Sequence, residues 1–325
     1  MLKLYYFLLS KKIHFLKYCR YHFDVMKFLL EGRSLRERDE GNTNKRLRTF
    51  RKYMTEENKT RFLNKLDNKG KNIGKKLIKK IENIMYSNIL PYGNIFDAEE
   101  KKQQESFANF CIENKDIIPF DINEVWSYLN YFYIEKLDDE FKNLEWKDII
   151  DCGWYNWDSS LAMVKYLKDI LNVYCIEPEI ENFKNIKKQI ITQNAQNIIP
   201  INLWLWDRKF EAIITEGGAW SNLSADENTK WIKIQIDTVD NIVNKYNINP
   251  WLIKRDIEWF EYDSIVWAKK TIIKHRPILF ISIYHKWKDW FEILPLIDSW
   301  NLDYKFTLRR WNCFHPFADT LLVCY

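Results

Sequence analysis

The stretch that decides the fold runs from Ile149 to Asp158 and reads IIDCGWYNWD. Its apolar start is typical of a buried strand, and Gly153 is typical of the tight turn that ends such a strand. A helix is predicted to begin near Asp158. In an open α/β sheet a turn of this kind lies at the carboxyl ends of the strands, where these sheets bind nucleotide-like ligands.

A second predicted strand, 172–177, ends in Glu177 followed by Pro178. An acidic residue in this place can accept hydrogen bonds from two ribose hydroxyls. The alternative is an ordinary helix-start carboxylate, because acids favour the N-terminal ends of helices. The two units together predict the first half of a Rossmann-like site for an adenosine-bearing cofactor. The second glycine that such a turn normally carries is replaced by Trp157.

Strands and helices are predicted to alternate from residue 147 onward. Strands are expected at 147–152, 172–177, 197–203, 252–256, 278–284, 304–308 and 320–325. Helices are expected at 159–171, 179–191, from 256 to about 274, and 289–299, with an excursion of short strands at 207–237. The last two strands leave no room for a helix between them, which predicts an antiparallel pair at one edge. The fold class is therefore α/β, a mostly parallel seven-stranded sheet with an antiparallel C-terminal edge.

Composition places the chain among globular proteins. The apolar fraction is 46% and the charged fraction 29%, which is typical of a soluble domain. No apolar run reaches the length of a membrane span. The six cysteines are scattered without a C-x-x-C pair, and Cys152 and Cys175 fall in predicted strands. Reduced core thiols and a cytoplasmic location are expected.

The N-terminal arm is strongly basic, since residues 1–85 carry 23 lysines and arginines against 9 acidic residues. Apolar residues recur among these lysines at roughly helical spacing: Leu63, Leu66, Ile73, Leu77, Ile78 and Ile81. One interpretation is a surface for nucleic acid or for peripheral contact with an anionic membrane; the other is a solvated helical extension. The domains are predicted as a basic extension at 1–94, a helical cap at 95–146 and a catalytic domain at 147–325.

Several ordered motifs resemble the FkbM family of methyltransferases. Residues 254–261 read KRDIEWFE and are similar to the I-K-x-D-x-E-G-x-E segment of that family. Residues 277–286 read PILFISIYHK and are close to its S-x-Y-H strand. The resemblance covers about 147–325, including the stretch 151–158 and the last strand. It implies a Rossmann-like class I methyltransferase fold, S-adenosylmethionine as cofactor, and O-methylation of a hydroxyl on a sugar, glycan or secondary metabolite.

The resemblance also implies site residues. The cofactor-binding set is Asp151, Gly153, Trp154, Asn156, Trp157, Asp158, Glu177, Asn202 and Leu203, with the last two beside the adenine. The catalytic set is Asp256, Glu258 and His285. Asp256, Glu258 and Glu261 can act as base, position an acceptor hydroxyl or hold a divalent cation, or they can be ordinary helix-start acids. No H-x-x-x-H or C-x-x-C motif occurs, so no zinc site is predicted.

Tryptophan stands where the family pattern has glycine. The chain has only 8 glycines but 15 tryptophans, and the exchanges include Trp157, Trp259 and Trp267. One hypothesis is that UGA codons for glycine were translated as tryptophan; UGG codons at these three positions would refute it. If the tryptophans are genuine, the indole of Trp157 can fill cofactor space, and Trp259 and Trp267 force bulky rings into close packing.

Three functions therefore stay open at this stage. The leading one is an S-adenosylmethionine-dependent O-methyltransferase. The second is a catalytically inactive methyltransferase-like binding protein with a basic arm. The third is a nucleic-acid methyltransferase, which the arm favours and the lack of an N-P-P-Y-type motif disfavours. The acceptor and the oligomeric state are not predicted.

Overall fold

The structure is a computed structural model of the 325-residue chain. It describes residues 49, 51–86, 97–100, 102, 147–153, 159–160, 163–164, 167, 170–215, 231–257, 260–310 and 320–325. The chain divides into two compact units, Met1–Leu129 with Thr307–Thr320, and Asn130–Phe306 with Leu321–Tyr325. The predicted domain boundaries at 94 and 146 fall outside the described residues.

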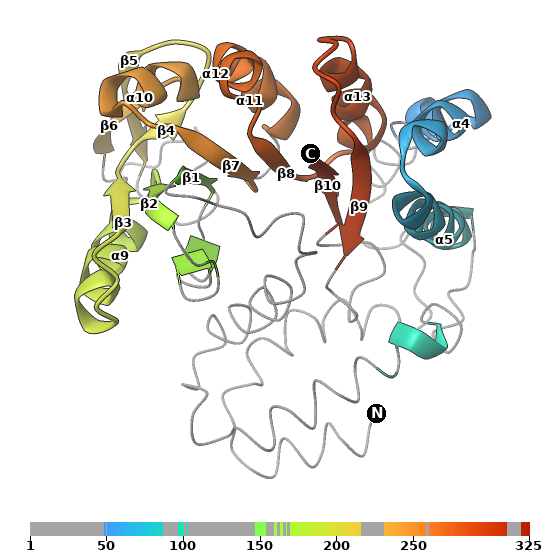
Figure 1. The fold of residues 1–325 in the computed structure, drawn as a ribbon, viewed down its shortest axis with the longest axis horizontal. Helices are drawn as coiled ribbons and strands as arrows, with labels where there is room; N and C mark the ends of the chain where they lie inside the picture. Colours follow the sequence, from blue (N-terminus) through green and yellow to red (C-terminus); the bar gives the residue numbers. More distant parts are fainter. Residues whose placement is uncertain are drawn as a thin grey trace. The chain divides into compact units, whose positions relative to one another are not determined.

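A seven-stranded sheet carries the fold, in the order β3-β2-β1-β7-β8-β10-β9 (Figure 1). Its strands are β1 (Lys147–Cys152), β2 (Ile170–Ile176), β3 (Ile198–Ile201), β7 (Pro250–Arg255), β8 (Ile278–Ser282), β9 (Phe306–Arg310) and β10 (Thr320–Cys324). β1, β2, β3, β7 and β8 pair in parallel, whereas β10 runs antiparallel to β8. This order and direction confirm the predicted fold class, the Rossmann-like class I methyltransferase fold.

The central strands are buried along almost their whole length. Ile149, Ile150 and Cys152 of β1 have no exposed surface, and Leu279 and Ile281 of β8 have none either. Continuous apolar runs of this kind are expected where helices cover both faces of a parallel sheet. The buried thiols of Cys152, Cys175 and Cys324 are free, and burial raises the pKa of each. The predicted burial of Cys152 and Cys175 in core strands is thus confirmed.

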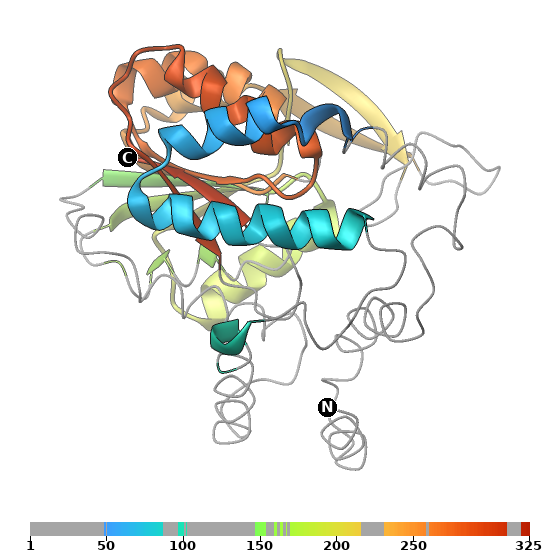
Figure 2. The ribbon, with the colours of Figure 1, turned by 90° about the vertical axis from the view of Figure 1, so that its right-hand side faces the viewer.

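Helices lie on both sides of this sheet (Figures 1 and 2). α10 (Val239–Tyr246), α11 (Glu261–Trp267), α12 (Lys269–His275) and α13 (Trp287–Asp298) lie on one side, and α9 (Ile180–Thr192) lies on the other. The predicted excursion forms a separate sheet in the order β4-β6-β5, from β4 (Trp204–Leu205), β5 (Phe210–Thr215) and β6 (Trp231–Asp237).

Several predicted boundaries differ from the observed ones by a few residues, and three of the differences are informative. The helix expected to reach 171 cannot do so, because β2 begins at Ile170, which pairs with Lys147. The helix expected to run to about 274 is broken at Ala268, since the Asp240 carboxylate of α10 accepts hydrogen bonds from the Thr271 backbone N–H and hydroxyl and starts a new helix. The strand expected to reach 284 ends at Ser282, which leaves Tyr284 and His285 in a bend.

In the first unit, α4 (Glu56–Lys65) and α5 (Asn68–Tyr86) pack side by side (Figure 2). The Asp67 Oδ1 atom accepts from the Gly70 backbone N–H (2.6 Å) at the start of α5 and from the Thr307 hydroxyl (2.8 Å). The apolar residues of the basic arm that are buried here are Leu66, Leu77, Ile78 and Ile81. This part of the arm therefore has a packed apolar face and is not solvated all round. Within the described ranges, no helix combines the length and the apolarity that crossing a membrane requires.

Candidate active site

The turn after β1 is closed against the end of β7. The Asp256 backbone N–H donates to the Cys152 carbonyl (3.0 Å), and Gly153 has a φ of +84° in the left-handed region that favours glycine. A Cβ on Gly153 would lie 1.8 Å from the Asp256 carbonyl oxygen. Glycine is thus required at 153 by its own backbone and by the chain that passes beside it.

The Asp151 carboxylate ties this turn to its surroundings. It is fully buried, and its Oδ2 atom accepts from the hydroxyls of Ser159 (2.6 Å) and Ser160 (2.7 Å) in the helix that follows. Its Oδ1 atom accepts from Lys254 Nζ (3.0 Å), which also donates to the Gly153 carbonyl (3.2 Å). One carboxylate therefore holds both ends of the loop and links β1 to β7. Contact of Asp151 with a cofactor stays a prediction.

Glu177 stands directly after β2 and is only 4% exposed. Its Oε1 atom accepts from the Glu179 backbone N–H (2.8 Å) at the start of α9, as the helix-start alternative requires. The Asn202 amide donates to the carbonyls of Glu177 (2.9 Å) and Pro178 (3.0 Å), and the Leu203 N–H donates to the Glu177 carbonyl (3.3 Å). Asn202 and Leu203 thus lie beside Glu177, as expected if the three residues form one site.

These segments meet at one edge of the sheet. Cys152 pairs with Ile176 of β2 on one side and with Arg255 of β7 on the other. The residues that follow these strands, Gly153, Glu177 and Asp256, therefore leave the sheet at the same edge. β1 is the point from which the strand order proceeds in opposite directions, and open α/β sheets bind their ligands in the crevice at such a switch point.

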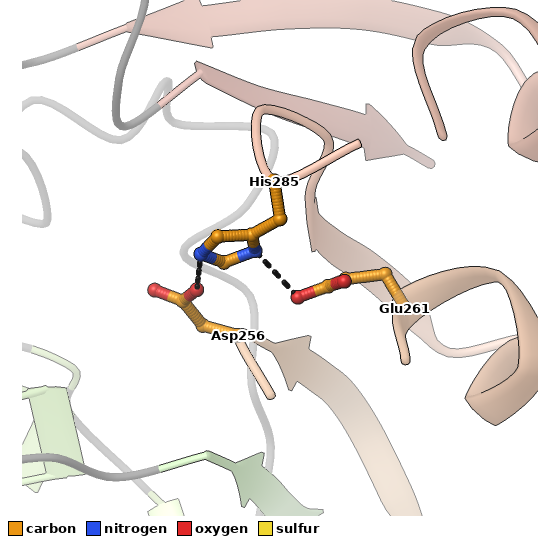
Figure 3. A group of neighbouring side chains, drawn as sticks. All are labelled: Asp256, Glu261 and His285. Atoms are coloured by element: carbon orange, nitrogen blue, oxygen red, sulfur yellow. Dashed lines mark hydrogen bonds and ion pairs between the residues drawn. The ribbon is translucent and has the colours of Figure 1, made fainter. Parts of the chain in front are cut away.

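A second cluster lies at the ends of β7 and β8 (Figure 3). His285 Nδ1 is 2.7 Å from Glu261 Oε1, and His285 Nε2 is 3.7 Å from Asp256 Oδ1. The Tyr284 hydroxyl donates to the same Asp256 oxygen (3.4 Å). The structure thus joins two of the predicted catalytic residues, Asp256 and His285, through contacts that the sequence spacing alone does not show.

Buried charges lie next to this cluster. Asp289 of α13 is 1% exposed, and burial together with the negative charge of Glu261 raises the pKa of its carboxyl to about 8. Arg255 has no exposed surface, and burial lowers the pKa of its guanidinium, an effect opposed by the nearby charges of Asp240 and Glu261. Within the described part of the chain, neither Asp289 oxygen has a hydrogen-bond partner.

Part of the predicted site lies outside the described residues, namely Trp154, Asn156, Trp157, Asp158 and Glu258. Trp267 is described, and it is half-buried at the end of α11 with its ring 5.3 Å from Trp206 and 6.5 Å from Phe260. Its indole packs into an aromatic cluster at a half-buried position, and the energetic cost expected for this ring stays a prediction.

Two residues at the candidate site, Lys254 and Asp289, were not among the predicted site residues, and Glu261 was named as a possible base or cation ligand but left out of the catalytic set. Glu261, the third acid of the segment 254–261, is the partner of His285. Lys254 donates a hydrogen bond to Asp151. The sequence feature that could have revealed it is a lysine near the end of an otherwise apolar strand. Asp289 had a weaker signal, an acid beside the fully buried Trp290 and Phe291.

In comparisons with known proteins, the chain matches solved structures but no family model and no curated sequence. It is similar to the solved structure of methyltransferase FkbM from Methylobacillus flagellatus KT, with 20% identity and a TM-score of 0.44, over 70% of this chain and 60% of that one. It is also similar to an rRNA methylase from Streptococcus thermophilus (11% identity, TM-score 0.36, 60% and 92% of the two chains). A methyltransferase from Geobacter sulfurreducens is similar at 10% identity and a TM-score of 0.36, over 69% and 87% of the chains. What the site can do therefore follows from its own geometry.

Proposed function

We propose that this protein is an S-adenosylmethionine-dependent methyltransferase that methylates a hydroxyl of a sugar, glycan or secondary metabolite. The observation that carries the proposal is the meeting of three elements at the switch point of the sheet. The glycine turn after β1, the acid after β2 and the polar cluster after β7 and β8 all leave the sheet at one edge.

The residues at this edge fit the cofactor that the fold implies. Glu177 follows β2, where a carboxylate can accept hydrogen bonds from ribose hydroxyls. Asn202 and Leu203 fix the backbone of Glu177 and lie beside it, which supports a position near the adenine. Asp151 and Lys254 hold the turn at Gly153, beside which the methionine end is expected. When bound, S-adenosylmethionine supplies an electrophilic methyl group on a sulfonium.

The acceptor side of the site is the cluster of Asp256, Glu261 and His285. In the transfer, the acceptor oxygen forms a bond to the methyl carbon, the carbon–sulfur bond breaks, and the sulfonium becomes a thioether. The hydroxyl must lose its proton, so it needs polar groups that hold its oxygen and favour the ionised form. This cluster provides two carboxylates and an imidazole at the ends of β7 and β8, next to the turn at Gly153.

Calorimetry with S-adenosylmethionine tests the cofactor half of the proposal. The variant Glu177→Gln is expected to weaken binding about tenfold or more, because a hydrogen bond to a charged group contributes roughly 1.5–3 kcal/mol. Glu181→Gln is the matched control, since Glu181 lies on the exposed surface of α9 and pairs with Lys184 (2.6 Å). The chain with Trp157→Gly is titrated in parallel, because an indole at 157 can block the cofactor. Absence of binding by both chains at millimolar cofactor would refute the proposal.

Formation of S-adenosylhomocysteine with a panel of sugar and phenolic acceptors tests the reaction itself. Transfer to a hydroxyl acceptor is expected, and transfer only to RNA or DNA would replace the proposed substrate class with a nucleic acid. Cofactor binding without any transfer would favour the inactive binding protein.

A further inference from the structure

Three side chains that commonly bind metals converge at the ends of β7 and β8. One carboxylate oxygen each of Asp256 and Glu261 and one ring nitrogen of His285 lie within 4.8 Å of one another. They come from the end of a strand, the start of a helix and the bend after a second strand (Figure 3). We propose that Asp256, Glu261 and His285 together bind one divalent cation, which holds the oxygen of the acceptor hydroxyl.

A second observation points independently to a ligand. Glu261 has no exposed surface, and its Oε2 atom has no hydrogen-bond partner among the described residues. Asp289, close enough for its carboxyl to feel the charge of Glu261, also lacks partners on both oxygens. Leaving carboxylate oxygens buried without a partner is costly. The buried guanidinium of Arg255, whose charge is close enough to act on Glu261, donates no hydrogen bond to these oxygens. A cation bound at Glu261 gives its Oε2 atom the partner that the described side chains do not.

The donor set indicates which cation fits. Carboxylate oxygens suit Mg²⁺ and Mn²⁺, whereas imidazole suits zinc and other first-row transition metals. Mn²⁺ accepts both kinds of donor and is the ion that this mixed set favours. The exposed fraction of the side chain is 0% for Glu261, 12% for His285 and 26% for Asp256. The ion is thus held from inside by Glu261, and its open side, next to Asp256, is where an acceptor oxygen can bind.

A histidine base activated by Glu261 is the competing use of the same residues. The contact between His285 Nδ1 and Glu261 Oε1 is what such a pair needs. However, the other ring nitrogen, which a base would use, faces the Asp256 carboxylate at 3.7 Å, and Glu261 Oε2 stays without a partner. A cation between the three side chains gives both features a role, so the geometry favours it.

Mn²⁺ binding by the full-length chain tests this inference. The chain is stripped with EDTA, desalted and titrated with MnCl₂, and free Mn²⁺ is followed by electron paramagnetic resonance. One Mn²⁺ per chain is expected, with Mg²⁺ competing for it. The variants Glu261→Gln, His285→Gln and Asp256→Asn are each expected to weaken binding at least about tenfold. Glu292→Gln is the matched control, because Glu292 is a half-buried acid of α13 that lies 3.7 Å from Lys288.

The outcomes distinguish the metal site from the proposed function. Binding of the ion does not depend on the proposed function, whereas its role in holding the acceptor hydroxyl does. Circular dichroism verifies the fold of each variant, and Asp256→Asn, at a partly exposed position, serves if a buried variant does not fold. No stoichiometric Mn²⁺ binding, or binding that the three variants leave unchanged, would overturn the inference. Methyl transfer that persists in EDTA would support the enzyme and refute the role of the ion in the reaction. Mn²⁺ binding lost in the variants, with no affinity for S-adenosylmethionine, would support the site and refute the enzyme.

Discussion

The Asp289 carboxyl is expected to make the free energy of unfolding fall as the pH rises. An acid that is ionised in the folded chain has the opposite effect. Asp289 is 1% exposed, it has no hydrogen-bond partner within the described residues, and its pKa is raised from 3.8 to about 8 by burial and by the charge of Glu261. A buried acid of this kind is protonated in the folded chain at neutral pH and ionised in the unfolded chain.

The size of the effect follows from this difference. Between pH 4 and pH 8 the folded state binds one more proton at this group than the unfolded state. The stabilisation of the folded state by this bound proton is therefore fully present below about pH 4. It is lost as the pH rises from there through about 8, at roughly 1.4 kcal/mol per pH unit. From pH 5 to pH 7 this amounts to roughly 3 kcal/mol. Asp289→Asn replaces the protonated carboxyl with a neutral group of similar shape and removes this slope.

Urea unfolding at pH 5, 6, 7 and 8, in EDTA to exclude cation binding, measures the effect. The free energy of unfolding of the wild-type chain minus that of Asp289→Asn is expected to fall steadily over this range. Glu292→Gln, on the same helix at a half-buried position, is expected to follow the wild type. Parallel curves for the wild type and Asp289→Asn across all four pH values would show that Asp289 is ionised in the folded chain and that the reasoning is wrong.

Three further substitutions test the packing around the site and in the first unit. Gly153→Ala places a methyl group 1.8 Å from the Asp256 carbonyl oxygen at a φ of +84°, so a loss of about 2–4 kcal/mol is expected in urea unfolding; a loss under about 0.5 kcal/mol would mean that the turn relaxes freely. Lys254→Met leaves the buried Asp151 without its cation and is expected to cost about 3–5 kcal/mol by thermal unfolding, and an unchanged midpoint would contradict this. Asp67→Ala removes the acceptor at the start of α5 and is expected to cost about 1 kcal/mol in urea unfolding, with no loss if water replaces the cap.

Local sequence determined the elements of the sheet. The run from Ile149 to Cys152 is buried and mostly apolar, the run from Ile278 to Ile281 is wholly apolar, and such runs are typical of strands covered on both faces. Gly153 predicted the turn, because glycine readily adopts positive φ angles. The structure has such a φ at this position. Together with the motifs around Asp256 and His285, these features predicted the fold class and the edge of the sheet at which the candidate site lies.

Only the tertiary structure decided which of the polar residues contact one another. Lys254 lies 103 positions from Asp151, and His285 lies 24 positions from Glu261, so neither pair has a local spacing to reveal it. The break at Ala268 depends likewise on Asp240 from another helix. The physical reason is that burial and backbone conformation leave a periodic trace along the chain, whereas pairing between charges depends on strand register and on how the helices pack.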